Sequence, residues 1–194
     1  MSLPQRDALR HTFGEYLTWS DVGRADLING IAYVREPPAP SRTHQEFGGE
    51  LYFQIRLAIE GKAFRAYIAP FDVRLPHSAE ADEQVDTVVQ PDVLVVSDLT
   101  KLDERGMRGA PDWLAEILSP ATAGHDQIVK LPAYERAGVL EVWFVHPTDR
   151  IVSIYRLIGG RYGPPTVLEL KGRTAISAIP GVAIDWDRVP GRTG

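Results

Sequence analysis

Two short apolar runs constrain the fold more than any other feature of this chain. QPDVLVVS spans residues 90–97 and PDWLAEILSP spans residues 111–120, and proline or polar residues bound both runs. Runs of this length with such boundaries are typical of buried strands. Each also carries a carboxylate, Asp92 in the first and Glu116 in the second. Because a carboxylate is rarely buried without a partner or a metal ion, both residues require a compensating group.

Other helical and strand patterns lie on both sides of these two runs. Apolar residues at helical spacing predict helices at 4–18, 41–59 and 121–138, the last ending at Gly138, and Asn29-Gly30 predicts a β-hairpin turn. Further strands are expected at 141–146, 150–157, 166–170 and 182–186, and a hairpin or bent pair of strands within 61–75. A charged link is expected at 98–109. This order predicts an α+β or α/β fold, with a mixed central sheet flanked by helices and an N-terminal hairpin.

The length and composition favour one ordinary globular domain. The 194 residues suffice for a single domain with a sizeable core. Residues 1–40 are interpreted as an N-terminal helix and hairpin extension, and residues 187–194 as a loosely held tail. The chain has no cysteine, which excludes disulfides and cysteine-based zinc sites. No apolar run reaches the length of a membrane span, and the first residues lack a signal-peptide core, so a cytoplasmic protein without a membrane partner is expected.

The charge leaves the binding partner open. A net charge of −5 argues against a broadly cationic nucleic-acid binder, but a local groove remains compatible with it. An acidic cleft that binds a cation would itself contribute negative charge. The phosphate-loop patterns and the GxSxG pattern of serine hydrolases are absent. The apolar strands at 141–146 and 150–157 predict a homodimer, because they supply much apolar surface for a domain of this size.

The positions of the two carboxylates indicate a metal site. In a strand, Glu116 shares one face with Leu114 and Leu118. Asp92 opens the neighbouring predicted strand, from which its side chain can reach the same sheet edge. Two such oxygens, with a main-chain carbonyl and waters, would suit a hard divalent ion such as Mg²⁺. A turn residue at Asp92 and a buried ion pair of Glu116 with an arginine remain open as alternatives.

A candidate cation follows on the next predicted helix. Asp126, Lys130 and Tyr134 are spaced four residues apart and therefore form one polar stripe. Because this helix directly follows the strand of Glu116, its first turn is expected beside the carboxylates. The alternative is an ordinary exposed ion pair between Asp126 and Lys130, which would contribute only a few tenths of a kcal/mol.

These residues together resemble a known family. The segments PDVLVV, APDWLAEILSPAT, AGVLEVWFVHP and IVSIYRL, with the intervening Asp, Lys and Tyr, resemble the Uma-two family. That domain of unknown function belongs to the PD-(D/E)XK, or restriction-endonuclease-like, superfamily. The resemblance implies a restriction-endonuclease-like fold and an endonuclease that hydrolyses DNA with Mg²⁺ or Mn²⁺. The alternatives left open are a catalytically inactive binding or assembly module and a small-phosphoester hydrolase.

The resemblance also implies roles for individual residues. Asp92 and Glu116 correspond to the two acidic metal ligands, and the main-chain carbonyl of Ile117 is a third. The superfamily expects its lysine at the position of Leu118, whereas the Uma-two pattern places it on the following helix, here Lys130. The implied accessory residues are Asp26, His44, Asp126 and Tyr134.

Two departures and one competing residue bear on this assignment. Asp26 stands where the family usually has glutamate. Pro132 interrupts the helix, so that the helix either kinks there or begins later than its pattern indicates. Asp112 forms a second Pro-Asp pair and shares the strand face of Glu116 by spacing. The family resemblance favours Asp92 over Asp112, which is interpreted as a turn residue.

Overall fold

The computed structural model describes residues 10–19, 25–34, 40–119 and 123–189. Its centre is a mixed sheet with the strand order β12-β11-β10-β9-β6-β3, and β13 pairs with β11 beside β12. The members are β3 (Arg65–Ile68), β6 (Val93–Val96), β9 (Trp113–Ile117), β10 (Glu141–His146), β11 (Ile151–Ile158), β12 (Arg161–Tyr162) and β13 (Thr166–Glu169). Only the β9–β10 pair is parallel among the described pairs of this sheet.

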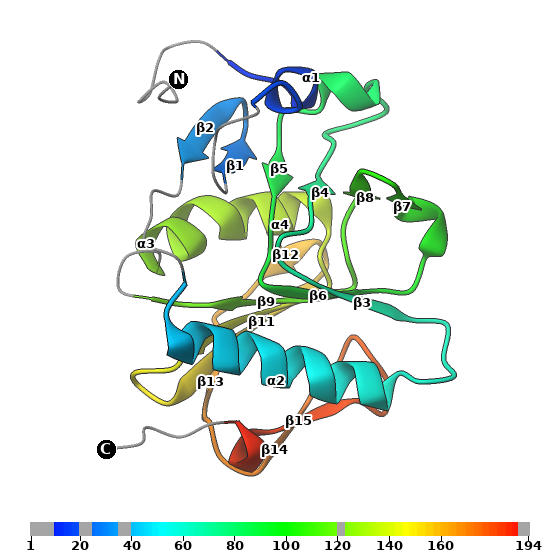
Figure 1. Cartoon of the computed structure of the whole chain (residues 1–194). Helices are drawn as coiled ribbons and strands as arrows, with labels where there is room; N and C mark the ends of the chain where they lie inside the picture. Colours follow the sequence, from blue (N-terminus) through cyan, green and yellow to red (C-terminus); the bar gives the residue numbers. More distant parts are fainter. Residues whose placement is uncertain (1–9, 20–24, 35–39, 120–122, 190–194) are drawn as a thin grey trace.

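A second sheet of short strands lies on one side of the central one (Figure 1). Its order is β2-β1-β5-β4-β8-β7. The members are β1 (Ala25–Ile28), β2 (Ile31–Val34), β4 (Val73–Arg74), β5 (Val88–Val89), β7 (Leu102–Asp103) and β8 (Gly106–Arg108). The predicted hairpin is confirmed: β1 and β2 pair around Asn29 and Gly30, whose φ angles of 50° and 79° give the left-handed turn that Asn-Gly favours. A third, two-stranded sheet joins β14 (Arg173–Ala175) to β15 (Ala183–Asp185).

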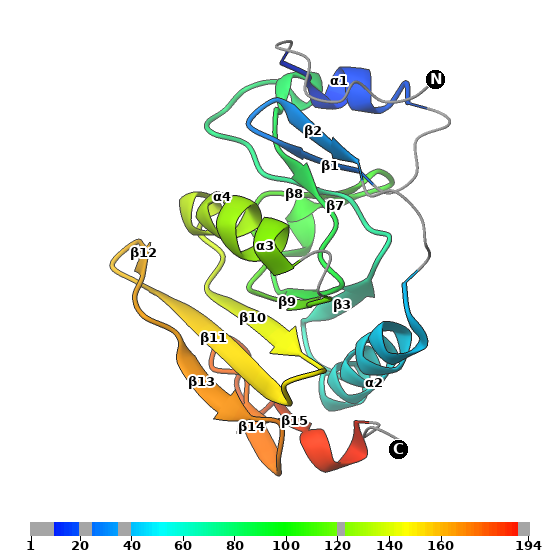
Figure 2. The same cartoon turned by 90° about the vertical axis from the view of Figure 1, so that its left-hand side faces the viewer.

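Helices cover both faces of the central sheet (Figure 2). α2 (Arg42–Ala58) packs Phe47, Leu51 and Ile55 against one face, as part of a core cluster with Trp113 and Trp143. The other face is covered by α3 (Ala123–His125), a π-helical turn (Asp126–Lys130) and α4 (Leu131–Ala137). Odd and even positions of β9 face opposite layers. All of its residues are buried, because both faces of the sheet are covered. A short helix, α1 (Phe13–Tyr16), lies by the second sheet.

Several local predictions are confirmed and others are corrected. The helix predicted at 41–59 is α2, and the two acid-bearing runs are the neighbouring strands β6 and β9. The helix predicted at 4–18 is wrong in extent, since helical residues are limited to 13–16 in the part that the structure describes, which begins at residue 10. The pair of strands predicted within 61–75 is not a hairpin, because β3 and β4 lie in different sheets.

Two further segments also differ from their predictions. The link 98–109 contains a 3₁₀ turn and the β7–β8 hairpin, so it is more ordered than a charged loop. Of the expected tail 187–194, residues 187 and 188 belong to a 3₁₀ turn that begins at Trp186 and Val189 is buried, while 190–194 lie outside the described residues. None of the described helices has the length and apolar character that a membrane span requires.

The helix predicted at 121–138 contains a π-helical turn just before Pro132, and its first two positions lie outside the described residues. The amide of Leu131 donates to the carbonyl of Asp126, five residues back, which is the bond of a π-helical turn. Pro132 follows as one of the first residues of α4, where its missing N–H costs least. The regular helix therefore begins later than the sequence pattern indicates. Its end is as predicted, since Gly138 adopts a left-handed φ of 89°.

Candidate active site

The strand register brings Asp92 and Glu116 to the same end of the central sheet, where β6 begins and β9 ends. In the antiparallel β6–β9 pair, Val93 is opposite Ala115. Continued by one residue, this register places Asp92 level with Glu116, and opposite residues of such pairs have Cα atoms about 5 Å apart. The Oδ2 atom of Asp92 also accepts a hydrogen bond of 2.8 Å from the amide of Ile117. The two carboxylates that the sequence singled out therefore share one end of the central sheet.

Glu116 points to the layer of α4. Its side chain is fully buried, and Oε1 accepts hydrogen bonds from the ammonium of Lys130 at 2.9 Å and from the hydroxyl of Tyr134 at 2.5 Å. Burial, together with the neighbouring charge of Glu116, raises the pKa of Tyr134 well above its usual value. Tyr134 is therefore a neutral donor that fixes one oxygen of Glu116.

Lys130 is a buried cation among three carboxylates. Besides Glu116, its Nζ lies 3.2 Å from Oδ1 of Asp126 and 3.4 Å from Oδ2 of Asp26. Lys130 and Asp126 are 0% and 1% exposed, so the alternative of an exposed helical ion pair is wrong. A buried ammonium is tolerated only where charges and hydrogen bonds surround it, which this arrangement provides.

The N-terminal hairpin supplies Asp26 from the second sheet. Asp26 lies on β1 and is almost fully buried, and its Oδ1 accepts a hydrogen bond of 3.2 Å from the amide of Gln90. Its Oδ2 lies 3.3 Å from Nε2 of His125. The ring of His125 also packs 4.7 Å, centroid to centroid, from Tyr33 on β2. These contacts connect the hairpin to the segment that carries Lys130.

His44 approaches Asp92 from the opposite layer. Its Nε2 lies 3.2 Å from Oδ2 of Asp92. The position of His44 is set by the start of α2, where the side chain of Ser41 accepts a hydrogen bond from the amide of His44. Burial acts to raise the pKa of Asp92, but the contacts with His44 and Ile117 outweigh it, and this pKa lies below its usual value.

The donor set fits a divalent ion that a substrate would help to bind. Three buried carboxylates (Asp26, Glu116 and Asp126) surround one ammonium and the buried Asp92 lies on the neighbouring strand, so the described cluster has an excess of acidic groups. Among the described residues, no three His, Asp or Glu side chains are arranged to hold a metal ion alone. Mg²⁺ commonly uses one or two carboxylates and completes its shell with waters and substrate phosphates. Asp92 and Glu116 suit that role, and the carbonyl of Ile117 stays a predicted ligand.

Two neighbouring positions are structural. Asp112 precedes β9 and accepts a hydrogen bond from the amide of Ser97, as a turn residue would. Leu118, at the position where the superfamily expects lysine, is buried and apolar.

His125 was not singled out from the sequence, and its contact with Asp26 spans 99 residues. Its place directly before the Asp126–Lys130–Tyr134 stripe was the available signal.

A comparison with solved structures identifies the fold. Five solved chains match this structure. One is described as the crystal structure of a putative nuclease belonging to DUF820 from Anabaena variabilis ATCC 29413. The TM-score is 0.72, the sequence identity is 19%, and the match covers 92% of this chain and 96% of the other. At this identity the likeness establishes the fold, which is nuclease-like.

The family follows from the sequence. The family model Uma2, described as "Putative restriction endonuclease", matches residues 13–187, and the chain belongs to this family. The resemblance inferred from the motifs is thereby confirmed. A search of curated proteins gave no match.

Proposed function

We propose that this chain is an endonuclease that hydrolyses DNA phosphodiester bonds with Mg²⁺ or Mn²⁺. Membership of the Uma2 family supports a nuclease in general. The observation that carries the finer proposal is the buried cluster at one end of β6 and β9, where Lys130 lies 2.9 Å from Glu116 and Asp92 is level with it. Buried carboxylates on adjacent strands with one lysine beside them suit charge-stabilised hydrolysis.

Each residue would have a separate task. Asp92 and Glu116, with the carbonyl of Ile117, would hold the ion, which supplies Lewis acidity and lowers the pKa of a bound water. Lys130 orients Glu116 and offsets negative charge that develops on the phosphate. Tyr134 restrains Glu116, and His44 restrains Asp92. Asp26 and Asp126 hold the ammonium of Lys130 in place.

Cleavage of supercoiled plasmid DNA tests the proposal. Wild type should convert the plasmid to nicked and linear forms with Mg²⁺ or Mn²⁺ and should stop when EDTA is added. Asp92→Asn and Glu116→Gln should each lose cleavage, because a neutral amide is a much weaker metal ligand than a carboxylate. Asp112→Asn is the matched control and should retain activity, since among the described contacts the side chain of Asp112 accepts only from the amide of Ser97. Cleavage by Asp92→Asn and Glu116→Gln at the rate of wild type and Asp112→Asn would overturn the proposal.

An inactive binding or assembly module is the second candidate. The observation that favours it is the complete burial of Lys130 among three carboxylates, which also suits a purely structural ion cluster. Such a module would bind DNA, or another partner, with no cleavage in either metal. Its Glu116→Gln variant would then change the melting temperature alone. Bis(p-nitrophenyl) phosphate in the same assay separates a small-phosphoester hydrolase from both.

The homodimer remains part of the proposal, on a revised basis. β10 was expected to supply apolar contact surface, but its residues 141–145 are buried within the monomer. The exposed apolar residues instead include Ile158 on β11 and Val167 and Leu168 on β13, at one edge of the central sheet. Light scattering at micromolar concentration tests the assembly, and a monomer mass would overturn it.

A further inference from the structure

The turn between β10 and β11 lies at the same end of the central sheet as the candidate active site. β10 runs parallel to β9, with Val145 beside Ile117. Residues 147–150 follow the end of β10 and therefore lie at the end of the sheet that carries Asp92 and Glu116. The first residues of α2 reach this edge too, because His44 contacts Asp92.

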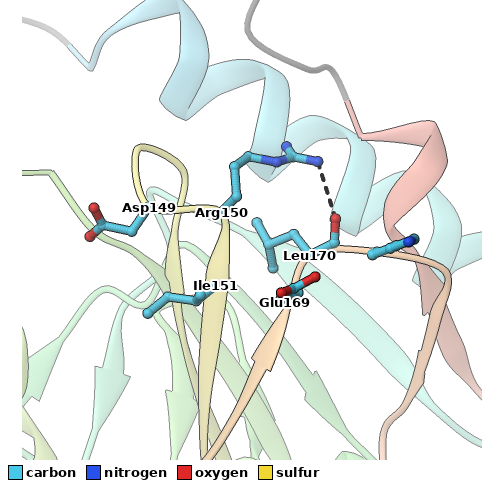
Figure 3. Close-up of a pocket in the computed structure, with 6 residues that line it drawn as sticks. Asp149, Arg150, Ile151, Glu169 and Leu170 are labelled. Carbon is cyan, nitrogen blue, oxygen red and sulfur yellow. Dashed lines mark hydrogen bonds between the residues drawn. The ribbon is translucent and has the colours of Figure 1, made fainter.

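A cavity of about 430 Å³ opens beside this turn (Figure 3). It is lined by Asp149, Arg150, Ile151, Glu169, Leu170 and Lys171. These residues come from the start of β11 and the end of β13, which pair with Ile151 opposite Glu169. The cavity thus has two cationic and two anionic side chains, and their orientation decides what it can bind.

Arg150 is held on the side of α2. Its backbone has a left-handed φ of 57°, which is uncommon for a residue other than glycine. Its Nη2 donates to the carbonyl of Leu170 at 3.2 Å, and its guanidinium lies 5.8 Å from the ring centroid of Phe47 on α2. Its Nη1 is covered and has no hydrogen-bond partner among the residues that the structure describes. A covered guanidinium nitrogen without an acceptor is costly, so this donor calls for a ligand or water.

The cationic side chains are better placed for an anion than the acidic ones are for a cation. Lys171 is exposed, and Arg150 is half-buried with its Nη1 covered and without an acceptor among the described residues. Figure 3 shows the carboxylate of Asp149 pointing away from the guanidinium of Arg150. Glu169 stays on the wall of the cavity and opposes an anion there.

We infer that this cavity binds a backbone phosphate of the nucleic-acid substrate, an inference that rests on the proposed nuclease function. Neighbouring strands lie about 4.8 Å apart, so the start of β11 is about 10 Å from β9, two strands away. One nucleotide advances about 3.4 Å along a duplex strand. On this proposal Arg150 and Lys171 contact a phosphate away from the cleaved bond, on the side of β11 and β13.

Fluorescence anisotropy with a labelled 20-base-pair duplex in EDTA tests this contact. The double variant Arg150→Ala/Lys171→Ala should raise Kd on the order of tenfold. The slope of log K against log salt should also become shallower by about 0.9, the change expected for the loss of one phosphate contact. The matched control is Lys62→Ala/Arg161→Ala, which also removes two exposed cations. Lys62 precedes β3 and Arg161 follows β11, so both lie toward the end of the sheet that is opposite the candidate site. That control should leave Kd and the salt slope unchanged.

Variants of the acidic wall give the opposite sign. Glu169→Gln removes a carboxylate that opposes the phosphate and should therefore tighten binding by a few fold. Because Arg150→Ala could disturb its turn, Arg150→Gln and the single Lys171→Ala variant are measured beside it, with a melting curve for each. Unchanged Kd in the folded Lys171→Ala and Arg150→Gln variants would overturn the inference, whatever Glu169→Gln does.

Cleavage assays separate this inference from the proposed function. The double variant should raise KM and leave kcat at saturating DNA unchanged, because the contact is remote from the cleaved bond. Duplexes shortened stepwise on the contacted side should lose the difference between variant and wild type once they no longer reach the cavity. If wild type cleaves DNA and the double variant matches it in KM, this inference alone fails. If wild type neither binds nor cleaves DNA, both fail.

Discussion

The ammonium of Lys130 lies 2.9 Å from Oε1 of Glu116, although the two residues lie on different elements and 14 positions apart. The strand position two residues after Glu116 is occupied by Leu118, which carries no charge. The helical segment thus places beside the acidic strand a cation that the strand itself lacks. This relationship makes Lys130 the first residue to test.

Lys130→Ala should reduce cleavage by on the order of a hundredfold or more, because one group that acts on transition-state charge typically contributes this much. It should also lower the free energy of unfolding by about 3–5 kcal/mol, since buried carboxylates lose their partner. Plasmid cleavage below the melting temperature, corrected for the folded fraction, measures the first effect. Lys130→Arg should not restore the rate, because a planar guanidinium differs in shape from a compact ammonium.

The control for Lys130 is Lys101→Ala. Lys101 donates to the carbonyl of Ala110 at 2.8 Å and is only partly buried, away from the carboxylate cluster. Its loss should leave cleavage within about twofold of wild type. Cleavage by Lys130→Ala at the wild-type rate would show that the lysine is structural.

Tyr134→Phe should destabilise the protein by about 1.5–3 kcal/mol, because it removes a hydrogen bond to a buried charged group. Urea unfolding followed by circular dichroism measures this change. Tyr162→Phe is the matched comparison, since its hydroxyl donates to the neutral carbonyl of Val139 at 2.7 Å. The loss at Tyr162 should be about 1 kcal/mol, the usual contribution of a neutral hydrogen bond. A larger loss at Tyr162 than at Tyr134 would contradict the charged contact.

The lowered pKa of Asp92 predicts a pH dependence of stability. A carboxyl whose pKa is lower in the folded state adds stability above its unfolded value, near 3.8, and loses it as pH falls through the folded pKa. The difference in unfolding free energy between wild type and Asp92→Asn should therefore be constant near neutral pH and shrink below about pH 4. Urea titrations from pH 7 to pH 3 measure it. A difference that grows on acidification would reverse the sign and refute the prediction.

Gly106→Ala should destabilise the second sheet strongly. Gly106 begins β8 with φ of 115°, and a Cβ there would lie 2.2 Å from the carbonyl oxygen of Asp72. Both the clash and the backbone angle are unfavourable, with a cost of about 2–4 kcal/mol. Gly49→Ala is the opposite control, because nothing lies within 4 Å of its added Cβ on α2. It should stabilise by about 0.5–1 kcal/mol, and melting curves compare the two variants.

Local patterns were sufficient for much of the architecture. Strand-length apolar runs identified β6 and β9, Asn29-Gly30 identified the hairpin turn, and apolar spacing identified α2. Each of these depends on residues close in sequence, through backbone preference or the period of a buried face. The same patterns singled out Asp92 and Glu116, since a carboxylate inside an apolar run is unusual wherever the strand packs.

Only the tertiary structure decided which layers meet. β3 and β4 follow each other in the chain but belong to different sheets, and Asp26 reaches Lys130 from the second sheet. Lys130 and Asp126 have the spacing of an exposed helical pair, and their burial depends on the hairpin and β9 packing around them. The sequence by itself thus determined the elements and the acidic candidates, because these follow from local spacing. Contacts between residues far apart in the chain, such as Asp26 and Lys130, determined the charge cluster, because they depend on how the sheets and helices pack.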